Sequence, residues 1–167
     1  MEILFFYLVA GVAIVSAFFV VKCRNPINSA LNLVTTFICL AVFYVMLESP
    51  FMAAIQIIVY AGAIMVLIIF VIMLLNFGQT IKGRYTHGIA AGGLVSVLLM
   101  LVATQLVRSG DATGTGGPVT SAMIAEVGHT ELIGRALFLD FVLPFEIAGV
   151  LLLIAIVGAL IIAKQKV

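Results

Sequence analysis

The sequence contains very little charge. Asp, Glu, Lys and Arg make up 9% of its 167 residues, and 65% of the residues are hydrophobic. Ordinary globular domains hold roughly 25% charged residues, so a soluble domain of this composition would have too little polar surface to cover its core. In a bilayer the same composition is usual, because the surrounding solvent is hydrocarbon. We therefore expect a single membrane domain that comprises residues 1–167.

The chain also lacks the clusters that hold cofactors or perform catalysis. It shows no Cys/His cluster, no glycine-rich phosphate loop, and no Ser, His and Asp set that a fold could assemble. Cys23 and Cys39 lie in apolar sequence at a spacing that fits neither a disulfide nor a metal site. A net charge of +1 gives no reason to expect a nucleic-acid partner. We expect no cofactor, metal or catalytic residue in this chain.

What the sequence does contain is long apolar stretches, separated by its few charges. Each is about as long as the 20 or so residues that a membrane-spanning helix requires. The sequence therefore predicts an all-α integral membrane protein with about five transmembrane helices. The predicted spans are residues 3–21, 27–47, 51–76, 87–107 and 141–163.

One connection, residues 108–140, is much longer than the others. Its first part is rich in Gly and Thr, which is typical of a flexible loop. Its second part, residues 122–139, mixes acidic with apolar residues. That pattern fits a short amphipathic helix on the membrane surface or on a neighbour, and it fits a plain ordered loop equally well.

The basic residues predict the orientation. Most of them fall on one side of the membrane: Lys22, Arg24, Lys82, Arg84, Lys164 and Lys166; the other side holds Arg108 and Arg135. Because basic residues favour the cytoplasmic side, the N-terminus should lie outside and the C-terminus in the cytoplasm. This bias favours a bacterial inner (plasma) membrane over a mitochondrial or plastid membrane.

The third apolar stretch is too long for a simple span. Residues 49–81 carry no charge and would measure roughly 50 Å as a straight helix, against a hydrocarbon core of about 30 Å. Tyr60 lies in its middle and is followed by three small residues, Ala61, Gly62 and Ala63. One interpretation is a packing notch beside a satisfied tyrosine. The other is a π-bulge, which occurs frequently at functional sites.

Glu146 is the only acid within a predicted span. Carboxylates inside a membrane commonly serve as ion or proton sites. However, Glu146 follows Pro144 closely and lies near the start of the last helix. A carboxylate in a first helical turn is stabilised by the helix dipole and the free amides there, so an interfacial acid without further function is the alternative.

Three segments carry a resemblance to a known family. NPINSALNLVTTF at 25–37, IQIIVYAGAIMVLIIFVIMLLN at 55–76 and LPFEIAGVLLLIAIVGALIIAKQ at 143–165 closely resemble the subunit J family of NADH-quinone oxidoreductase, respiratory complex I. The order and spacing of the five spans resemble that family too. Residues 108–134 carry no resemblance.

The resemblance implies a membrane-arm subunit that couples quinone reduction to proton translocation and carries no redox centre. It implies that NADH, FMN, iron–sulfur clusters and quinone belong to partner subunits, and that the neighbours are membrane-arm subunits, especially A, H, K and N. In the family the third helix holds a π-bulge that can convert to an α-helix, gating a water path toward buried glutamates of subunit K. The switch residues would be Tyr60, Ala61, Gly62, Ala63 and Met65, with Glu146 as an anchoring or proton-facing carboxylate.

Two other classes of protein remain as alternatives. A stand-alone ion transporter usually shows several buried ionisable groups or an inverted repeat, whereas this chain has one acid and no repeat. A structural or assembly protein would explain the missing chemistry but not the tyrosine and small residues in an overlong helix. A related complex that takes electrons from ferredoxin or another reduced cofactor would use a similar subunit.

Overall fold

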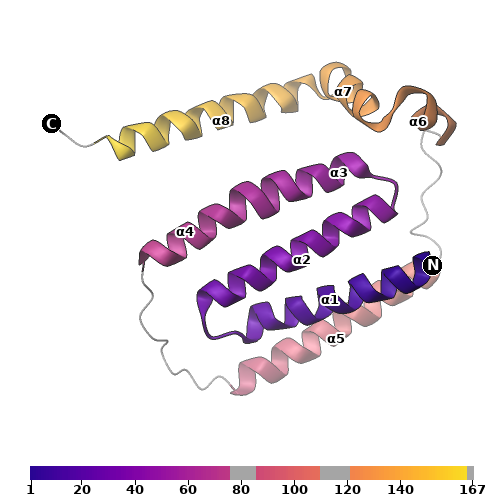
Figure 1. Ribbon diagram of the computed structural model, residues 1–167, viewed down its shortest axis with the longest axis vertical. Helices are drawn as coiled ribbons and strands as arrows, with labels where there is room; N and C mark the ends of the chain where they lie inside the picture. The colour runs from indigo at the N-terminus through magenta and orange to yellow at the C-terminus, as the bar shows by residue number, and fades with distance from the viewer. Residues whose placement is uncertain (76–85, 110–120, 165–167) are drawn as a thin grey trace. The chain divides into compact units, whose positions relative to one another are not determined.

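The computed structural model of the protein describes residues 1–75, 86–109 and 121–164, and its regular elements there are all helical (Figure 1). Eight are α-helices and one, η1, is a π-helix. Their bounds are α1 Glu2–Lys22, α2 Pro26–Met46, α3 Pro50–Ile55, η1 Gln56–Ile64, α4 Met65–Leu75, α5 Thr86–Ser109, α6 Ser121–Val127, α7 His129–Leu139 and α8 Val142–Ala163.

Five helical segments of the described chain are long and apolar enough to cross a membrane, as predicted. They are α1, α2, the continuous helix Pro50–Leu75 that α3, η1 and α4 form together, part of α5, and α8. The ends of α1, α2 and α8 and the start of the third helix lie within one residue of the predicted ends, whereas the apolar span in α5 begins at Gly92, five residues after the predicted start. The all-α membrane fold is therefore confirmed, whereas the orientation of the termini stays a prediction.

In the long connection before α8, the helical alternative for residues 122–139 is confirmed over the plain loop. Residues 121–139 of this connection form the short helices α6 and α7. Gly128 lies between them with φ +90°, a conformation that glycine adopts without a steric cost, and it divides the segment into two helices. The Gly/Thr-rich residues 110–120 and the expected loop at 76–85 lie outside the described residues.

Contacts group the chain into two units, Met1–Gly117 and Pro118–Val167. In the first, α2 contacts α1 on one side and α3, η1 and α4 on the other, so it is the central helix of a three-helix layer (Figure 1). In the second, α7 contacts α6 and α8, and the rings of Phe138 and Phe145 meet with centroids 4.9 Å apart. The single membrane domain stays a prediction.

The turns between α1, α2 and α3 follow from their sequences. Asn25 caps α2 by accepting a hydrogen bond from the Ile27 N–H at 2.9 Å, and Pro26 occupies the first turn, where a missing N–H is harmless. At the other end of α2, the Ser49 N–H donates to the Tyr44 oxygen and the Glu48 N–H donates to the Val45 oxygen. This is the Schellman pattern, with Glu48 at φ 55° in the position that usually holds glycine.

Hydroxyl groups fasten α1 to α2. The Ser16 Oγ lies 2.9 Å from the Thr36 Oγ1, and each hydroxyl is also close to a carbonyl oxygen of its own helix, that of Ala13 or of Asn32. Because each hydroxyl has one hydrogen, these three contacts share two hydrogens, and the hydroxyl that donates across the interface shares its hydrogen with, or gives up, the bond to its own helix. At the turn, the Ser29 hydroxyl donates to the Val20 oxygen. The hairpin is thus held by interhelical hydrogen bonds, which contribute to association in a lipid environment.

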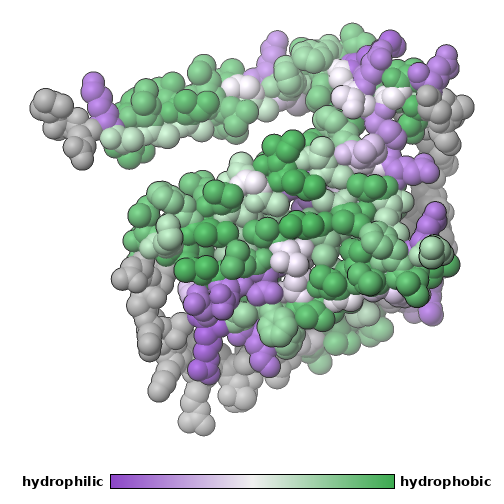
Figure 2. Space-filling view, viewed as in Figure 1, coloured by the Kyte–Doolittle hydropathy of each residue, from purple (hydrophilic) through white to green (hydrophobic). Residues whose placement is uncertain are grey.

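The outer surface of this layer is largely hydrophobic, and hydrophilic side chains gather toward the ends of the helices (Figure 2). Few side chains are buried within the described residues; the apolar ones are Val9, Ala30, Cys39, Ala41, Ala53 and Met65, and the polar ones are Ser16 and Gln56. Such a surface is suited to hydrocarbon or to further membrane helices.

A double-mutant cycle tests the hydroxyl pair. We expect a coupling free energy of about 0.6 kcal/mol between Ser16→Ala and Thr36→Val, the average for hydrogen bonds between membrane helices. Thr35→Val is the matched control, because the Thr35 hydroxyl is exposed and donates only to the Leu31 oxygen of its own helix. Unfolding of the purified chain in mixed micelles measures the free energies, and equal coupling of Ser16 to Thr35 would contradict the assignment.

Candidate functional site

The candidate site is the π-helix in the middle of the third membrane helix. At its start the Gln56 N–H is shared between the oxygens of Met52 and Ala53, and directly after its end the Met65 N–H donates to Tyr60, five residues earlier, and to Gly62. An offset of five residues defines the π-helix. The π-bulge interpretation of this segment is therefore confirmed, and η1 has nine residues, more than the usual single turn.

The local sequence explains why the backbone widens here. Ile57, Ile58 and Val59 are β-branched, which lowers their preference for the α-helix. A Cβ atom on Gly62 would lie only 3.1 Å from the backbone oxygen of Ile57, closer than a side chain normally tolerates. Glycine therefore permits a close approach between residues five apart, which is the spacing that the π-helix brings together.

Tyr60 faces α2 from the centre of the π-helix. Its ring lies edge-on to Phe37 of α2, with centroids 5.8 Å apart and an interplanar angle of 62°. Its side chain is 45% exposed within the unit. The hydroxyl forms no hydrogen bond with any described residue, so the alternative of a satisfied tyrosine receives no support from the contacts of this chain.

Three residues of the continuous helix are buried: Ala53, Gln56 and Met65. The neighbour that α3, η1 and α4 share is α2, so these residues mark the face that packs on α2. Met65 is 1% exposed and is the first residue after the π-helix. Any rotation of α4 about its axis would remove Met65 from this contact.

Gln56 is the residue that the sequence interpretation missed. Its side chain is 7% exposed, and it forms no hydrogen bond with the described residues. A signal was present, because Gln56 and Tyr60 are the only side chains in Pro50–Leu75 with strong hydrogen-bonding groups. Both lie within the π-helix.

The other predicted residues divide between two places. Ala61, Gly62 and Ala63 lie with Tyr60 inside η1, directly before Met65. Glu146 belongs to the second unit and is the fifth residue of α8. The first-turn interpretation of Glu146 is therefore wrong, since α8 begins at Val142. Its carboxylate is exposed and has no ion pair among the described residues.

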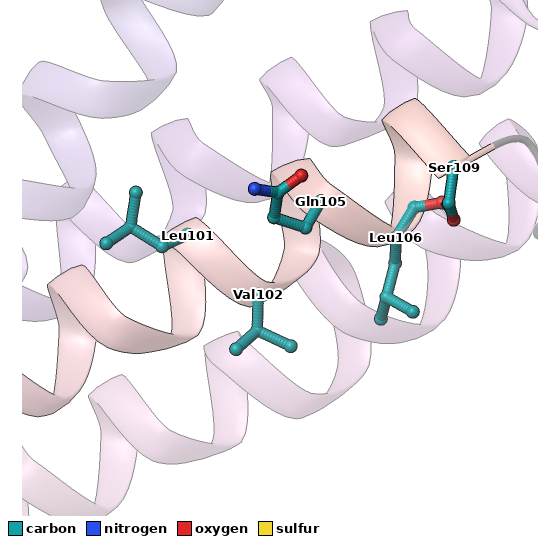
Figure 3. A pocket seen from close by; sticks show the side chains of 5 residues that line it. All are labelled: Leu101, Val102, Gln105, Leu106 and Ser109. Atoms are coloured by element: carbon teal, nitrogen blue, oxygen red, sulfur yellow. Dashed lines mark hydrogen bonds between the residues drawn. The ribbon is translucent and has the colours of Figure 1, made fainter.

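Neither a pocket nor a metal cluster adds chemistry in the described part of the chain. A depression on α5 is lined by five residues of that one helix (Figure 3): Leu101, Val102, Gln105, Leu106 and Ser109. The Ser109 hydroxyl already donates to the Leu106 oxygen at 2.9 Å. Among residues 1–75, 86–109 and 121–164, no three His, Cys, Asp or Glu side chains are grouped so that they could bind a metal ion.

Comparison with known proteins gives a consistent result. The protein family described as NADH-ubiquinone/plastoquinone oxidoreductase chain 6 matches residues 16–162. The chain is 35% identical to NAD(P)H-quinone oxidoreductase chain 6 of Leptolyngbya boryana, over 99% of this chain and 81% of that one. It is 34% identical to NADH-quinone oxidoreductase subunit J of Pseudomonas aeruginosa, over 96% and 95% respectively, and 33% identical to subunit J of Rhodobacter capsulatus, over 96% and 80%.

Replacing Gly62 by Ala should shift the backbone toward the α-helix. The new Cβ would crowd the Ile57 oxygen, and relief of an overpacked contact is worth about 1 kcal/mol, which corresponds to a roughly fivefold change in the ratio of the two forms. Solid-state NMR of the chain in bilayers, with labels at the Met65 amide and at the carbonyls of Tyr60 and Ala61, measures which carbonyl accepts the bond.

The matched control for this substitution is Gly11→Ala in α1. It changes helix propensity by the same amount, but its Cβ would meet no atom within 4 Å. The Met65 hydrogen bond should then stay on Tyr60. An unchanged Met65 bond in Gly62→Ala would show that Gly62 does not determine the π geometry.

Proposed function

Since the chain belongs to the NADH-ubiquinone/plastoquinone oxidoreductase chain 6 family and is a membrane-arm subunit of NADH-quinone oxidoreductase, we propose that its third membrane helix couples quinone reduction to proton translocation. The observation that carries the proposal is the π-helix at Gln56–Ile64. A subunit without a redox centre takes part in such coupling by changing its conformation.

The π-helix is suited to a two-state element. Both the π and the α pattern satisfy the backbone hydrogen bonds within the helix, as a lipid environment requires. Changing the offset from five residues to four would rotate α4 relative to α3 by an angle on the order of 100°, the rotation that one helical residue contributes. In the proposed switch, this rotation moves Met65 off α2 and changes which side chains face the neighbouring subunit.

The proposed rotation of α4 would open or close a path of water molecules. In this proposal residues 61–65 form the switch, the Tyr60 hydroxyl orders water, and the path leads toward carboxylates of the neighbouring subunit K. Small residues in η1 support it, because Ala61 and Ala63 leave room beside the Gly62 backbone. Glu146, exposed near the start of α8, would anchor a neighbouring subunit or face the proton path.

The remaining assignments follow from membership of the complex. NADH, FMN, iron–sulfur clusters and quinone would be bound by partner subunits, and subunits A, H, K and N would be the neighbours in the membrane. The bacterial relatives and the distribution of basic residues support a multi-pass protein of the bacterial inner membrane, with its N-terminus outside and its C-terminus in the cytoplasm.

Extraction in a mild detergent tests the assignment to the complex. Affinity purification through this chain should recover a large assembly with NADH-quinone reductase activity. The apolar outer surface of the first unit explains the expectation, because it requires lipid or other membrane helices around it. Recovery of the chain as a free monomer without redox partners would contradict the proposal.

Proton pumping by the assembled complex tests the switch. Gly62→Ala should lower quinone-linked pumping in membrane vesicles by roughly fivefold, because the crowded Cβ shifts the helix toward the α form. Oxidation of NADH by an artificial acceptor at the flavin should be unchanged, since no step of it passes through this helix. Gly11→Ala is the control and should pump normally. Normal pumping by an assembled Gly62→Ala complex would rule out the switch.

A further inference from the structure

The charged residues of this chain are divided unevenly between the two ends of its spans. All seven Asp and Glu residues lie at or near the ends that include the N-terminus of α1 and the turn after α2. The α1–α2 turn, the connection at 76–85 and the segment after α8 contain no acidic residue and six basic ones: Lys22, Arg24, Lys82, Arg84, Lys164 and Lys166. The positive charge at this end therefore has no carboxylate of the same chain to balance it.

The α1–α2 turn is the basic end that the structure describes in the first unit. Lys22 is the last residue of α1, and Arg24 follows two residues later. Both residues are exposed, and neither forms an ion pair within the part of the chain that the structure describes. Figure 2 shows hydrophilic side chains gathered at this turn, beside the largely hydrophobic surface of the spans.

Hydrogen bonds hold the backbone of this turn in one arrangement. The Asn25 side chain caps α2 by accepting from the Ile27 N–H, and the Ser29 hydroxyl of α2 donates to the Val20 oxygen of α1. The backbone between the two basic residues is thus fixed on both sides. A surface that is already ordered loses less conformational entropy when a ligand binds to it.

The charge of Lys22 lies at the edge of the apolar span. Its Nζ is 5.3 Å from the centroid of the Phe18 ring, so the side chain folds back along α1. A cation is attracted to the face of an aromatic ring, and more strongly where water is scarce. Phe18 belongs to the apolar span Glu2–Lys22. The ammonium group is therefore at the depth where hydrocarbon gives way to lipid headgroups.

An exposed apolar strip of α1 continues from Lys22 into the span. Phe18 and Ile14 lie four and eight residues before Lys22, on the same side of the helix, and they are 57% and 71% exposed. Gly11 follows on this side, and a Cβ placed on it would meet no atom within 4 Å. The strip is open along its length, as an aliphatic chain lying on it would require.

We propose that the α1–α2 turn binds an anionic phospholipid, whose phosphate contacts Lys22 and Arg24 and whose acyl chain lies along Phe18 and Ile14. Phosphate oxygens accept charge-assisted hydrogen bonds from ammonium and guanidinium groups. Zwitterionic lipids fit less well, because their cationic headgroup finds no carboxylate at this turn. The depth of the Lys22 charge beside Phe18 favours a lipid over an acidic protein surface, which would approach from beyond the headgroups. The proposal does not depend on the switch in the third helix.

Fluorescence quenching by brominated lipids tests the site. The chain contains no Trp, so Phe18→Trp introduces a single reporter that keeps an aromatic ring beside Lys22. The full-length chain is placed in bilayers of phosphatidylcholine and phosphatidylglycerol, with the same composition in both leaflets, so its orientation does not matter. Brominated phosphatidylglycerol should be preferred at the reporter by roughly 25-fold, since each basic side chain near the surface contributes about fivefold.

Matched variants locate the preference. Phe5→Trp places the reporter at the other end of α1, at a position that is also exposed, and should show no preference for the anionic lipid. In the Phe18→Trp chain, replacing both Lys22 and Arg24 by Gln should abolish the preference. Arg108→Gln removes one positive charge at the end of α5 and should leave it intact. Equal quenching by the two brominated lipids at the Phe18→Trp reporter would overturn the proposal.

Two further measurements separate a lipid from other anions. Inorganic phosphate should weaken the preference no more than chloride at the same ionic strength, which acts by screening alone; a larger loss in phosphate would indicate a site for soluble anions instead. In a high-resolution map of the complete complex, a lipid phosphate oxygen should lie within about 3.2 Å of a Lys22 or Arg24 nitrogen. A carboxylate of a neighbouring subunit in that place would overturn the proposal.

Discussion

Every feature of this chain depends on one constraint: in hydrocarbon, backbone N–H and C=O groups must find their partners within the protein. The constraint makes the spans helical, and it limits how a span can change its shape. An α-helix and a π-helix both satisfy it, with offsets of four and five residues. At Met65 the bond runs to Tyr60, so the chain already holds the less common of these two patterns. A change of state between them needs no exposed backbone group in lipid.

The two helix contacts of the three-helix layer differ in kind. Hydrogen bonds join α1 to α2, and apolar packing joins α2 to the third membrane helix. Interhelical hydrogen bonds hold α1 to α2, through Ser16 and Thr36 in the spans and Ser29 at the turn. No described side chain of the continuous helix Pro50–Leu75 forms a hydrogen bond with α2; that contact consists of apolar packing and the Phe37–Tyr60 ring pair. Apolar packing is not directional, so it tolerates rotation better than hydrogen bonds do. In the proposed function, the α1–α2 hairpin would be the support against which the third helix rotates.

The sequence predicted the spans well because membrane thickness fixes their length and charge marks their ends. Asn25 with Pro26, and Pro50, predicted the starts of α2 and α3 because caps and first-turn prolines act locally. Residues 122–139 remained ambiguous until the structure showed two helices divided at Gly128. The start of α8 placed Glu146 beyond the first turn, which the position of Pro144 alone did not determine. Gln56 was missed because burial depends on the register between η1 and α2, and that register arises from packing.

The chemistry of the π-helix also fits the apolar layer in which it lies. A carboxylate buried against α2 would have to be paired or neutralised, because an isolated charge is very costly away from water. The π-helix contains no Asp, Glu, Lys or Arg, and its polar side chains, Gln56 and Tyr60, need hydrogen-bonding partners and not a counter-ion. A helix without an acidic or basic side chain cannot store a proton, so in the proposed function storage would belong to ionisable groups of neighbouring subunits. The chain would then control whether protons reach those groups, which is a task that a helix with two backbone patterns can perform without a titratable residue of its own.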